Sequence, residues 1–348
     1  MRFMHMADVH LGAVPDSGAP WSGAREKEIW DTFRSSIQDA ASEQLDLLLI
    51  AGDLFHRQPL LAELKEVNYL FSTLPKTRVV LIAGNHDYLQ PASCYLNFPW
   101  NRNVACLFSR QCERVRFPEI NTEVYGLSYY RQEIQEPLYD ELRPVRDDYC
   151  HILLAHGGDS QHIPMSRELL AKSGFDYLAL GHIHKPQMVA ANKAAYAGAL
   201  GPIDCNDTGP HGYILGEYKK GKMSVSFVPK AKREYVPITI EAEEQDTTFS
   251  LRDKLEKQIE QRGWQHIYRV TLKGFREPGI QYDTDKMKDF GMVLDVSDQT
   301  VPAFHLDELK RKYNGQLIGR YIESFEGHDR SAVEELALQY GLEALLGS

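Results

Sequence analysis

Five short apolar runs in this chain are each followed directly by residues of the kinds that bind metal ions or transfer protons. The runs are Arg2–Met6, Leu45–Ala51, Val79–Ala83, His151–Ala155 and Tyr177–Leu180. Each has the length of a strand, and several lack polar alternation, as expected for strands that are buried on both faces. Helical patterns lie between them, with apolar residues every three to four positions. This alternation predicts an α/β architecture with layered sheets.

The residues that follow these runs form a consistent ligand set. They are Asp8 and His10, Asp53, Asn85 with His86 and Asp87, His156, and His182 with His184. Sites in open α/β sheets assemble beyond the carboxyl ends of strands, so we expect these side chains to meet. Carboxylate, imidazole and amide oxygen together suit Mn, Fe or Zn better than Ca or Mg. Any one of these residues alone would more often be structural, and it is their joint occurrence that indicates a site.

The order of the blocks, DxH, GD, GNHD, H and GHxH, resembles that of the calcineurin-like metallophosphoesterases. The resemblance implies that one metal ion is held by Asp8, His10 and His184, that a second is held by Asn85, His156 and His182, and that Asp53 bridges the two. It implies that His86 is not a ligand but faces the scissile phosphate, oriented by Asp87. The implied fold is a layered β-sandwich flanked by helices. The implied reaction is attack on phosphorus by water that two metal ions activate, and we expect these ions to be Mn, with Fe or Zn as alternatives.

Three of the blocks resemble more narrowly the SbcD-type DNA repair exonucleases. They are Asp8 to Gly12, Asp53 to His56, and Tyr177 to Lys185. The resemblance implies that His56 contacts the phosphodiester, the alternative being a capping or surface histidine. It also implies DNA as a partner, together with an ATPase related to SbcC that grips a C-terminal helical segment. The block Gly198–Asp204 departs from the serine-bearing pattern expected for that branch.

A change of composition near residue 235 predicts two domains. We expect a catalytic domain over residues 1–235 and a smaller α+β capping and partner-binding domain over residues 236–348. Leu306–Phe325 and Ala332–Leu346 each show a helical pattern, and the second has an apolar surface that would bind a partner or pack on its own domain. The basic stretch Lys219–Arg233 is either a track for phosphates or a solvated hairpin with lysines on one face.

Charge and targeting signals restrict the choice of function. The net charge of −10 argues against a broadly basic protein that coats DNA, but a nuclease needs only a local basic groove. The first residues do not resemble a signal peptide, and no apolar run approaches the roughly 20 residues of a membrane span. We therefore expect a cytoplasmic protein without a membrane partner.

Three functional hypotheses follow from the sequence. The first is a two-metal phosphodiesterase that acts on DNA as an exonuclease subunit. The second is a small-molecule phosphodiesterase or phosphatase, acting for example on nucleotides. The third, a non-catalytic scaffold, is disfavoured because every ligand position is filled. A homodimer stays open in all three.

Overall fold

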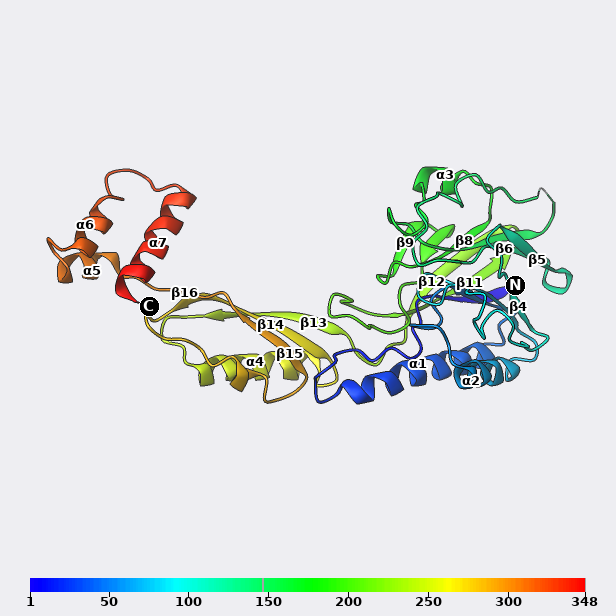
Figure 1. Ribbon diagram of the computed structural model, residues 1–348, viewed down its shortest axis with the longest axis horizontal. Helices are drawn as coiled ribbons and strands as arrows, with labels where there is room; N and C mark the ends of the chain where they lie inside the picture. Colours follow the sequence, from blue (N-terminus) through cyan, green and yellow to red (C-terminus); the bar gives the residue numbers. More distant parts are fainter. Residues whose placement is uncertain (146, 348) are drawn as a thin grey trace. The chain divides into compact units, whose positions relative to one another are not determined.

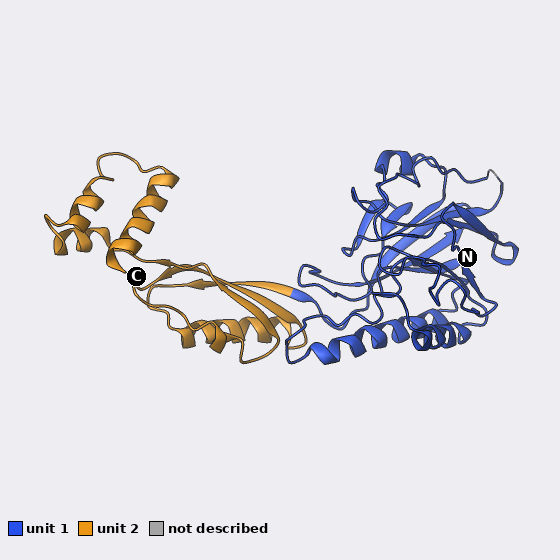
Figure 2. Cartoon of the chain, viewed as in Figure 1, with its two compact units in different colours: residues 1–235 blue, residues 236–348 orange. Residues whose placement is uncertain are grey.

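The computed structural model describes residues 1–145 and 147–347, and the chain divides into two compact units (Figure 1). Unit 1 comprises residues 1–235 and unit 2 comprises residues 236–348 (Figure 2). The division falls at the change of composition near residue 235. Within the described residues, no helix combines the length and the hydropathy that a membrane span requires.

The first sheet of unit 1 has the strand order β12-β11-β1-β2-β3-β4. Its strands are β1 (Arg2–Met6), β2 (Leu47–Ala51), β3 (Arg78–Ile82), β4 (Val104–Cys106), β11 (Gly212–Lys219) and β12 (Lys222–Pro229). Strands β1 to β4 are parallel, and β11 joins the sheet antiparallel to β1. All five residues of β2 are buried, which explains why this run shows no alternation in the sequence.

The second sheet of unit 1 has the strand order β5-β6-β7-β8-β10-β9. Its strands are β5 (Glu113–Phe117), β6 (Thr122–Gly126), β7 (Cys150–His156), β8 (Tyr177–Gly181), β9 (Gln187–Ala190) and β10 (Ala194–Tyr196). A 3-10 turn, η1 (Pro118–Ile120), links β5 to β6, and a short helix, α3 (Arg167–Ala171), precedes β8. Strands β6, β7 and β8 are parallel to one another.

Alternate residues of each inner strand enter different cores. Leu48 and Ile50 of β2 face helices α1 (Ser22–Ser42) and α2 (Leu61–Ser72), whereas Leu47 and Leu49 pack against the second sheet. Because side chains alternate along a strand, one buried run can serve two layers. The expected layered β-sandwich flanked by helices is therefore confirmed.

Unit 2 has its own hydrophobic core. Its elements are β13 (Tyr235–Ala242), α4 (Thr248–Arg262), β14 (Ile267–Arg276), η2 (Asp285–Met287), β15 (Val293–Asp298), β16 (Val301–Pro302), α5 (Leu306–Lys312), α6 (Leu317–Glu323) and α7 (Ala332–Leu346). Helix α4 begins at a capping box, in which Thr247 and Ser250 satisfy each other's backbone N–H groups. Leu251, Leu255 and Ile259 of this helix pack on the sheet of β13, β14 and β15. Helices α6 and α7 share a smaller, separate apolar cluster.

The structure corrects one expectation about the helices. The pattern over Leu306–Phe325 is not one continuous helix but two short helices, α5 and α6. The chain breaks between them at Gly315, whose φ of 73° lies in the left-handed region. Glycine adopts this conformation without a steric penalty, so it ends a helix where an apolar pattern alone would continue it.

The basic stretch Lys219–Arg233 comprises the turn between β11 and β12, the strand β12 and the residues that follow it. Near the end of the stretch, Lys230 pairs with Asp39 of α1, and Arg233 pairs with Glu28 of the same helix. Lys230 and Arg233 are thus already paired with carboxylates of the same chain, which leaves fewer cations in this stretch to bind phosphates. The exposed lysines at the turn of the hairpin are Lys219, Lys220 and Lys222.

We expect the core that α2 shares with α1 and the first sheet to be a major source of stability in unit 1. Phe71 is fully buried, with its ring centroid 6.3 Å from that of Phe33 and 6.0 Å from that of Trp100. The change Phe71→Ala should lower the free energy of unfolding by about 3–5 kcal/mol, because it removes buried apolar surface and leaves a cavity. Urea denaturation followed by tryptophan fluorescence measures this loss. Tyr69→Ala on the same helix is the matched control, since Tyr69 is 69% exposed, and an equal loss in both variants would contradict this view of the core.

Candidate metal centre

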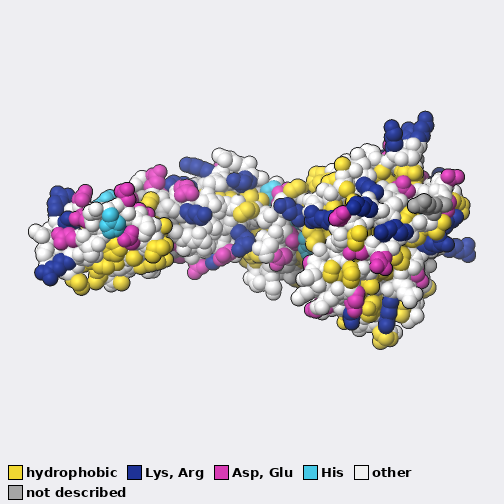
Figure 3. Space-filling model, turned by 90° about the horizontal axis from the view of Figure 1, so that it is seen from above, with side chains coloured by type: hydrophobic (Ala, Val, Ile, Leu, Met, Phe, Trp, Pro, Cys, Tyr) yellow, Lys and Arg dark blue, Asp and Glu magenta, His cyan; other side chains and the backbone are white. Residues whose placement is uncertain are grey.

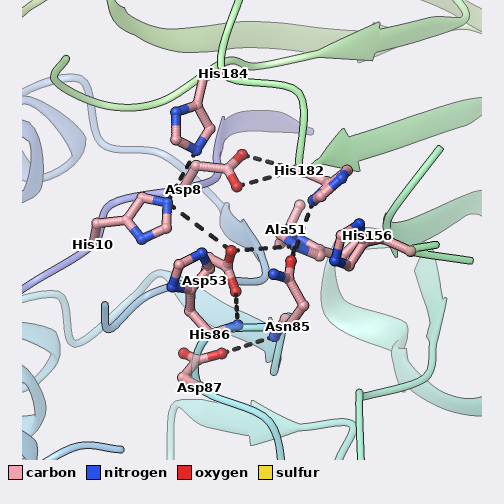
Figure 4. Close-up of polar contacts among 12 residues, drawn as sticks. Asp8, His10, Ala51, Asp53, Asn85, His86, Asp87, His156, His182 and His184 are labelled. Atoms are coloured by element: carbon pink, nitrogen blue, oxygen red, sulfur yellow. Dashed lines mark hydrogen bonds and ion pairs between the residues drawn. The ribbon is translucent and has the colours of Figure 1, made fainter. Parts of the chain in front are cut away.

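The residues expected to bind metal ions come together at the carboxyl ends of strands from both sheets (Figure 4). Asp8 and His10 follow β1, Asp53 follows β2, Asn85 follows β3, His156 ends β7, and His182 and His184 follow β8. The loop after β1 is hydrogen bonded to the loop after β2, through Asp8 N to Gly52 O at 3.2 Å. The parallel arrangement of the inner strands therefore brings groups far apart in sequence into one pocket.

The backbone is strained where it presents several of these side chains. Asp8, His10 and Asp53 have φ values of 49°, 52° and 49°, and His182 has a φ of 94°. Positive φ is uncommon for residues other than glycine and carries an energy of about 1–3 kcal/mol each. Strain of this kind persists only where surrounding structure enforces it, and it gathers at functional sites.

Two glycines allow the two sheets to approach each other at the pocket. A Cβ atom on Gly52 would lie 2.4 Å from Nδ1 of His156, and one on Gly181 would lie 2.0 Å from the carbonyl oxygen of Ala51. Both distances are shorter than any side chain tolerates. The glycines of the GD and GHxH blocks are thus needed for close packing as well as for turning the chain.

The first group of ligand atoms belongs to Asp8, His10 and His184, which lie within 4.8 Å of one another. Nε2 of His10 is 3.1 Å from Nε2 of His184, so two imidazole nitrogens point at the same small volume. When both nitrogens carry their lone pairs, these repel each other at this distance. A cation between these nitrogens would remove that repulsion.

The second group surrounds His156, whose ring lies beside Asn85, Asp53 and His182. Nδ1 of His156 donates to the carbonyl oxygen of Ala51 at 2.8 Å, so in the neutral ring Nε2 carries the lone pair. That nitrogen lies 2.9 Å from Oδ1 of Asn85 and 3.4 Å from Oδ2 of Asp53. Oδ1 of Asn85 is also 3.2 Å from Nδ1 of His182. With the His156 ring neutral, acceptors therefore face acceptors here too, which fits a second cation.

Asp53 lies between the two groups. Its Oδ2 atom, which is 3.4 Å from His156, is also 3.9 Å from Nε2 of His10. Its Oδ1 atom accepts the backbone N–H of His86 at 2.9 Å. One carboxylate oxygen is thus shared by both groups, as a bridging ligand requires.

The surroundings of His156 and His184 favour positive charge on these two histidines. Burial would lower the pKa of His156, but the charge of Asp53 and the hydrogen bond to it raise that pKa to about 9. The pKa of His184 is also raised to about 9, against the effect of burial, by its hydrogen bond to Asp207. Burial raises the pKa of Asp53, but His156 outweighs it and holds this pKa below the usual range of a carboxyl. A divalent ion would supply the charge that these residues stabilise.

His56 and His86 lie beside the first group, and one ring nitrogen of each lies within 4.8 Å of the other and of a ring nitrogen of His10. Their rings are stacked, with centroids 5.0 Å apart, and both are half-buried, whereas Asp8 and His10 are fully buried. Nδ1 of His86 donates to the carbonyl oxygen of His56 at 3.1 Å. Nδ1 of His56 lies 3.3 Å from Nδ1 of His10. These two histidines therefore lie between the buried ligands and solvent.

Asp87 differs from the expectation that it orients His86. Its carboxylate accepts the backbone N–H of Gly84 at 2.8 Å and that of Phe55 at 3.2 Å, while the ring of His86 is held by the carbonyl of His56. Burial, followed by the charge of Asp53, raises the pKa of Asp87 to about 7. Asp87 is fully buried, so its oxygens cannot be hydrated, and each accepts from a backbone N–H group instead. Asp87 thus ties the loop after β3 to the loop after β2.

Two carboxylates that the sequence did not single out also contact the centre. Oδ2 of Asp159 lies 2.8 Å from Nε2 of His182, and both oxygens of Asp207 lie 3.1 Å from Nδ1 of His184. Asp159 follows His156 by three residues, and Asp207 lies just beyond the block that departs from the expected pattern. No spacing rule connects either one to a ligand, so only the tertiary contacts reveal them.

Comparison with known proteins agrees with this geometry. The calcineurin-like phosphoesterase family matches residues 1–186. The "Uncharacterized metallophosphoesterase YhaO" of Bacillus subtilis is 30% identical over 247 residues, which cover 65% of this chain and 60% of that protein. The "DNA double-strand break repair protein Mre11" of Methanocaldococcus jannaschii is 28% identical over 267 residues, which cover 69% of each chain. The Mre11 protein of Methanopyrus kandleri is 27% identical over 252 residues, which cover 64% of this chain and 55% of that one.

The family match spans more than half of this chain and contains all the blocks from Asp8 to His184. The matched regions cover only part of the relatives' own lengths, 60% for the first and 55% for the last. The buried clusters of histidine and aspartate could hold metal ions, which suits a metal-dependent phosphoesterase. The chain therefore belongs to the calcineurin-like phosphoesterases and is a metal-dependent hydrolase of phosphate esters.

Proposed function

We propose that this chain is a nuclease that hydrolyses phosphodiester bonds of DNA with two divalent metal ions. The observation that carries the proposal is the pair of ligand groups that share Oδ2 of Asp53, with two further histidines beside them. Similarity to the Mre11 proteins, which are named for DNA double-strand break repair, supports DNA as the substrate class.

The proposed ligands keep the sequence-based assignment. One ion is assigned to Asp8, His10 and His184, the other to Asn85, His156 and His182, and Asp53 is assigned to both. When bound, two such ions supply Lewis-acid stabilisation of phosphoryl oxygens and lower the pKa of water. The mixed oxygen and nitrogen donors suit Mn, and they suit Fe and Zn as well.

We assign to His86 the role of stabilising the negative charge that develops on the substrate. Its Nδ1–H is held by the carbonyl of His56, and its backbone N–H is held by Asp53. The ring is therefore fixed relative to a proposed ligand, and in its protonated form Nε2–H can donate to a phosphoryl or leaving oxygen. Because His56 stacks on His86, we assign it to binding the phosphodiester beside the reacting phosphate.

Helix α7 is the proposed contact for an ATPase of the SbcC type, which the sequence resemblance implies. One face of α7 packs within unit 2 through Leu338 and Leu342. Other apolar side chains of the helix remain exposed, namely Val333 at 76%, Leu336 at 54% and Tyr340 at 65%. Figure 3 shows hydrophobic side chains gathered along one edge of the helical part of unit 2, beside charged side chains of both signs. An exposed apolar patch of this kind marks a protein contact.

The experiment that tests the substrate class follows a labelled linear duplex on a gel with the full chain and Mn²⁺. We expect progressive shortening of the duplex, and complete arrest by a chelator. An aryl phosphodiester and a set of nucleotides form the parallel arm. If the duplex stayed intact while a small phosphodiester was cleaved, DNA would be the wrong substrate and the metal chemistry would stand.

The role of His86 is tested by His86→Ala. Loss of a positioned proton donor should lower the rate of duplex cleavage at least ~100-fold, because general acid–base groups contribute about 10²–10⁴. Metal content, measured by plasma mass spectrometry, should match that of the unchanged chain. His328→Ala, at an exposed histidine of unit 2, is the matched control. Full activity of His86→Ala, or loss of metal from it, would contradict the assignment.

The contact surface on α7 is tested by the double change Leu336→Asp and Tyr340→Asp. Charges on this surface should abolish co-purification with the co-expressed SbcC-type ATPase from the same organism, since they cannot be desolvated in an apolar interface. The melting temperature should stay unchanged, because both side chains are exposed. Glu335→Ala on the same helix should bind as the unchanged chain does. Unimpaired binding by the double variant would place the contact elsewhere.

A further inference from the structure

The two histidines of the GHxH block present different ring nitrogens to the pocket. His182 directs Nδ1 toward Oδ1 of Asn85, at 3.2 Å, whereas His184 directs Nε2 toward Nε2 of His10, at 3.1 Å. In each case the nitrogen on the far side of the ring meets a carboxylate. Nε2 of His182 lies 2.8 Å from Oδ2 of Asp159, and Nδ1 of His184 lies 3.1 Å from both oxygens of Asp207.

Both carboxylates are fixed by backbone donors. Oδ1 of Asp159 accepts from the N–H groups of Gln161 and His162, both at 2.8 Å. Oδ2 of Asp207 accepts from the N–H of Ile203 at 3.0 Å and from that of Asp204 at 3.1 Å. Each carboxylate is therefore anchored through one oxygen. The other oxygen of Asp159 contacts His182 and also Nδ1 of His162 at 2.9 Å, and the other oxygen of Asp207 contacts His184.

A neutral imidazole carries one N–H and one lone pair, and a carboxylate only accepts. The carboxylate therefore holds the proton on the far nitrogen, and the lone pair is on the nitrogen that faces the pocket. In His156 the proton is held on the far nitrogen, Nδ1, by the backbone carbonyl of Ala51 and not by a side chain. The tautomers of His182 and His184 thus depend on side chains that can be replaced.

We propose that Asp159 and Asp207 are positioning residues, each of which sets the tautomer and orientation of one histidine of the GHxH block. The inference rests on the proposed two-metal centre and not on the identity of the substrate. Since the two histidines are assigned to different ions, each carboxylate should govern the affinity of one ion. Outer groups of this kind are typically worth 10–100-fold in metal affinity.

A direct cation site at Asp159 is the competing explanation. The ligand atoms of Asp159, His162 and His182 lie within 4.8 Å of one another, so these residues could themselves hold an ion. A neutral ring has one lone pair, however, and His182 already directs Nδ1 into the main pocket. Binding a further ion through Nε2 would require the ring to lose its remaining proton. The positioning role needs no such step.

Replacement by asparagine separates the tautomer effect from a structural one. In Asp159→Asn the amide oxygen should remain with the N–H groups of Gln161 and His162, so the NH₂ group must face Nε2 of His182. That group can only donate, which forces the proton of His182 onto Nδ1, the nitrogen that faces the pocket. Asp159→Ala loses the backbone contacts but leaves the ring free to choose its tautomer.

The order of the two variants is therefore diagnostic. For the tautomer role, Asp159→Asn should bind Mn²⁺ more weakly than Asp159→Ala, while its metal-free melting temperature should be the higher of the two. A purely structural role would place the alanine variant lower in both measurements. At Asp207 both oxygens contact His184. The difference in Mn²⁺ affinity between Asp207→Asn and Asp207→Ala should therefore have the same direction but be smaller.

The experiment measures Mn²⁺ binding by titration calorimetry and follows the electron paramagnetic resonance spectrum of the loaded full chain. The unchanged chain should bind two ions and give the spectrum of a coupled pair. Asp159→Asn and Asp207→Asn should each weaken one ion about 10–100-fold and give the spectrum of a single, uncoupled Mn²⁺. Asp204→Asn, in the loop of Asp207, is the control, because its carboxylate contacts Asn206 in the same turn.

Three outcomes would overturn the inference. The first is two ions with unchanged affinity in both asparagine variants. The second is a third ion in the unchanged chain that disappears in both Asp159→Asn and His162→Ala, since it would show a direct site. The third is no Mn²⁺ binding by the unchanged chain, which would remove the proposed centre as well. The expected binding pattern without cleavage of DNA would leave this inference standing and would reject only the proposed substrate.

Discussion

The crowding of buried acceptor groups at the ends of five strands is the constraint on which the rest of unit 1 depends. Asp8, His10, Asp53 and His156 are at most 1% exposed, and Nε2 of His156 lies 2.9 Å from Oδ1 of Asn85 and 3.4 Å from Oδ2 of Asp53. Such an arrangement is unfavourable without a compensating charge, so the scaffold must hold these groups in place against their mutual repulsion. Inner strands that are buried on both faces provide the required rigidity.

The pocket is held together by successive layers of contacts. Strand ends place the proposed ligands, close packing at Gly52 and Gly181 brings the two sheets together, and hydrogen bonds to the far side of the histidine rings fix their direction. Asp87 serves the same purpose one step further out, since it joins two loops through their backbone N–H groups. Asp87, which the sequence suggested as a catalytic residue, therefore contacts the backbone of these two loops.

Unit 2 differs in character from unit 1. It has a core of its own around α4, and helices α6 and α7 form a small separate cluster in which few side chains are buried. A short helix with apolar residues on more than one side cannot bury all of them within so small a cluster. The exposed apolar side chains of α7 are the result, and they suit a role in binding rather than in catalysis.

The sequence by itself determined the inner strands, the family and which residues are available as metal ligands. Buried strands and their terminal residues are local features, so apolar runs followed by DxH, GD, GNHD, H and GHxH were enough to locate the centre. Local pattern also predicted the layered fold, because buried parallel strands leave runs without alternation. Where a single residue interrupts such a pattern, as Gly315 does between α5 and α6, the local reading was wrong.

Only the tertiary structure decided how the side chains are used. The pairing of Asp159 with His182 and of Asp207 with His184 joins segments 23 residues apart in both cases. The inward contacts of Asp87 and the ion pairs of Lys230 and Arg233 with α1 are equally invisible in the sequence. Each depends on the direction of a side chain relative to an element elsewhere in the chain. Residue type and spacing set which groups are available, but packing sets which of their atoms meet.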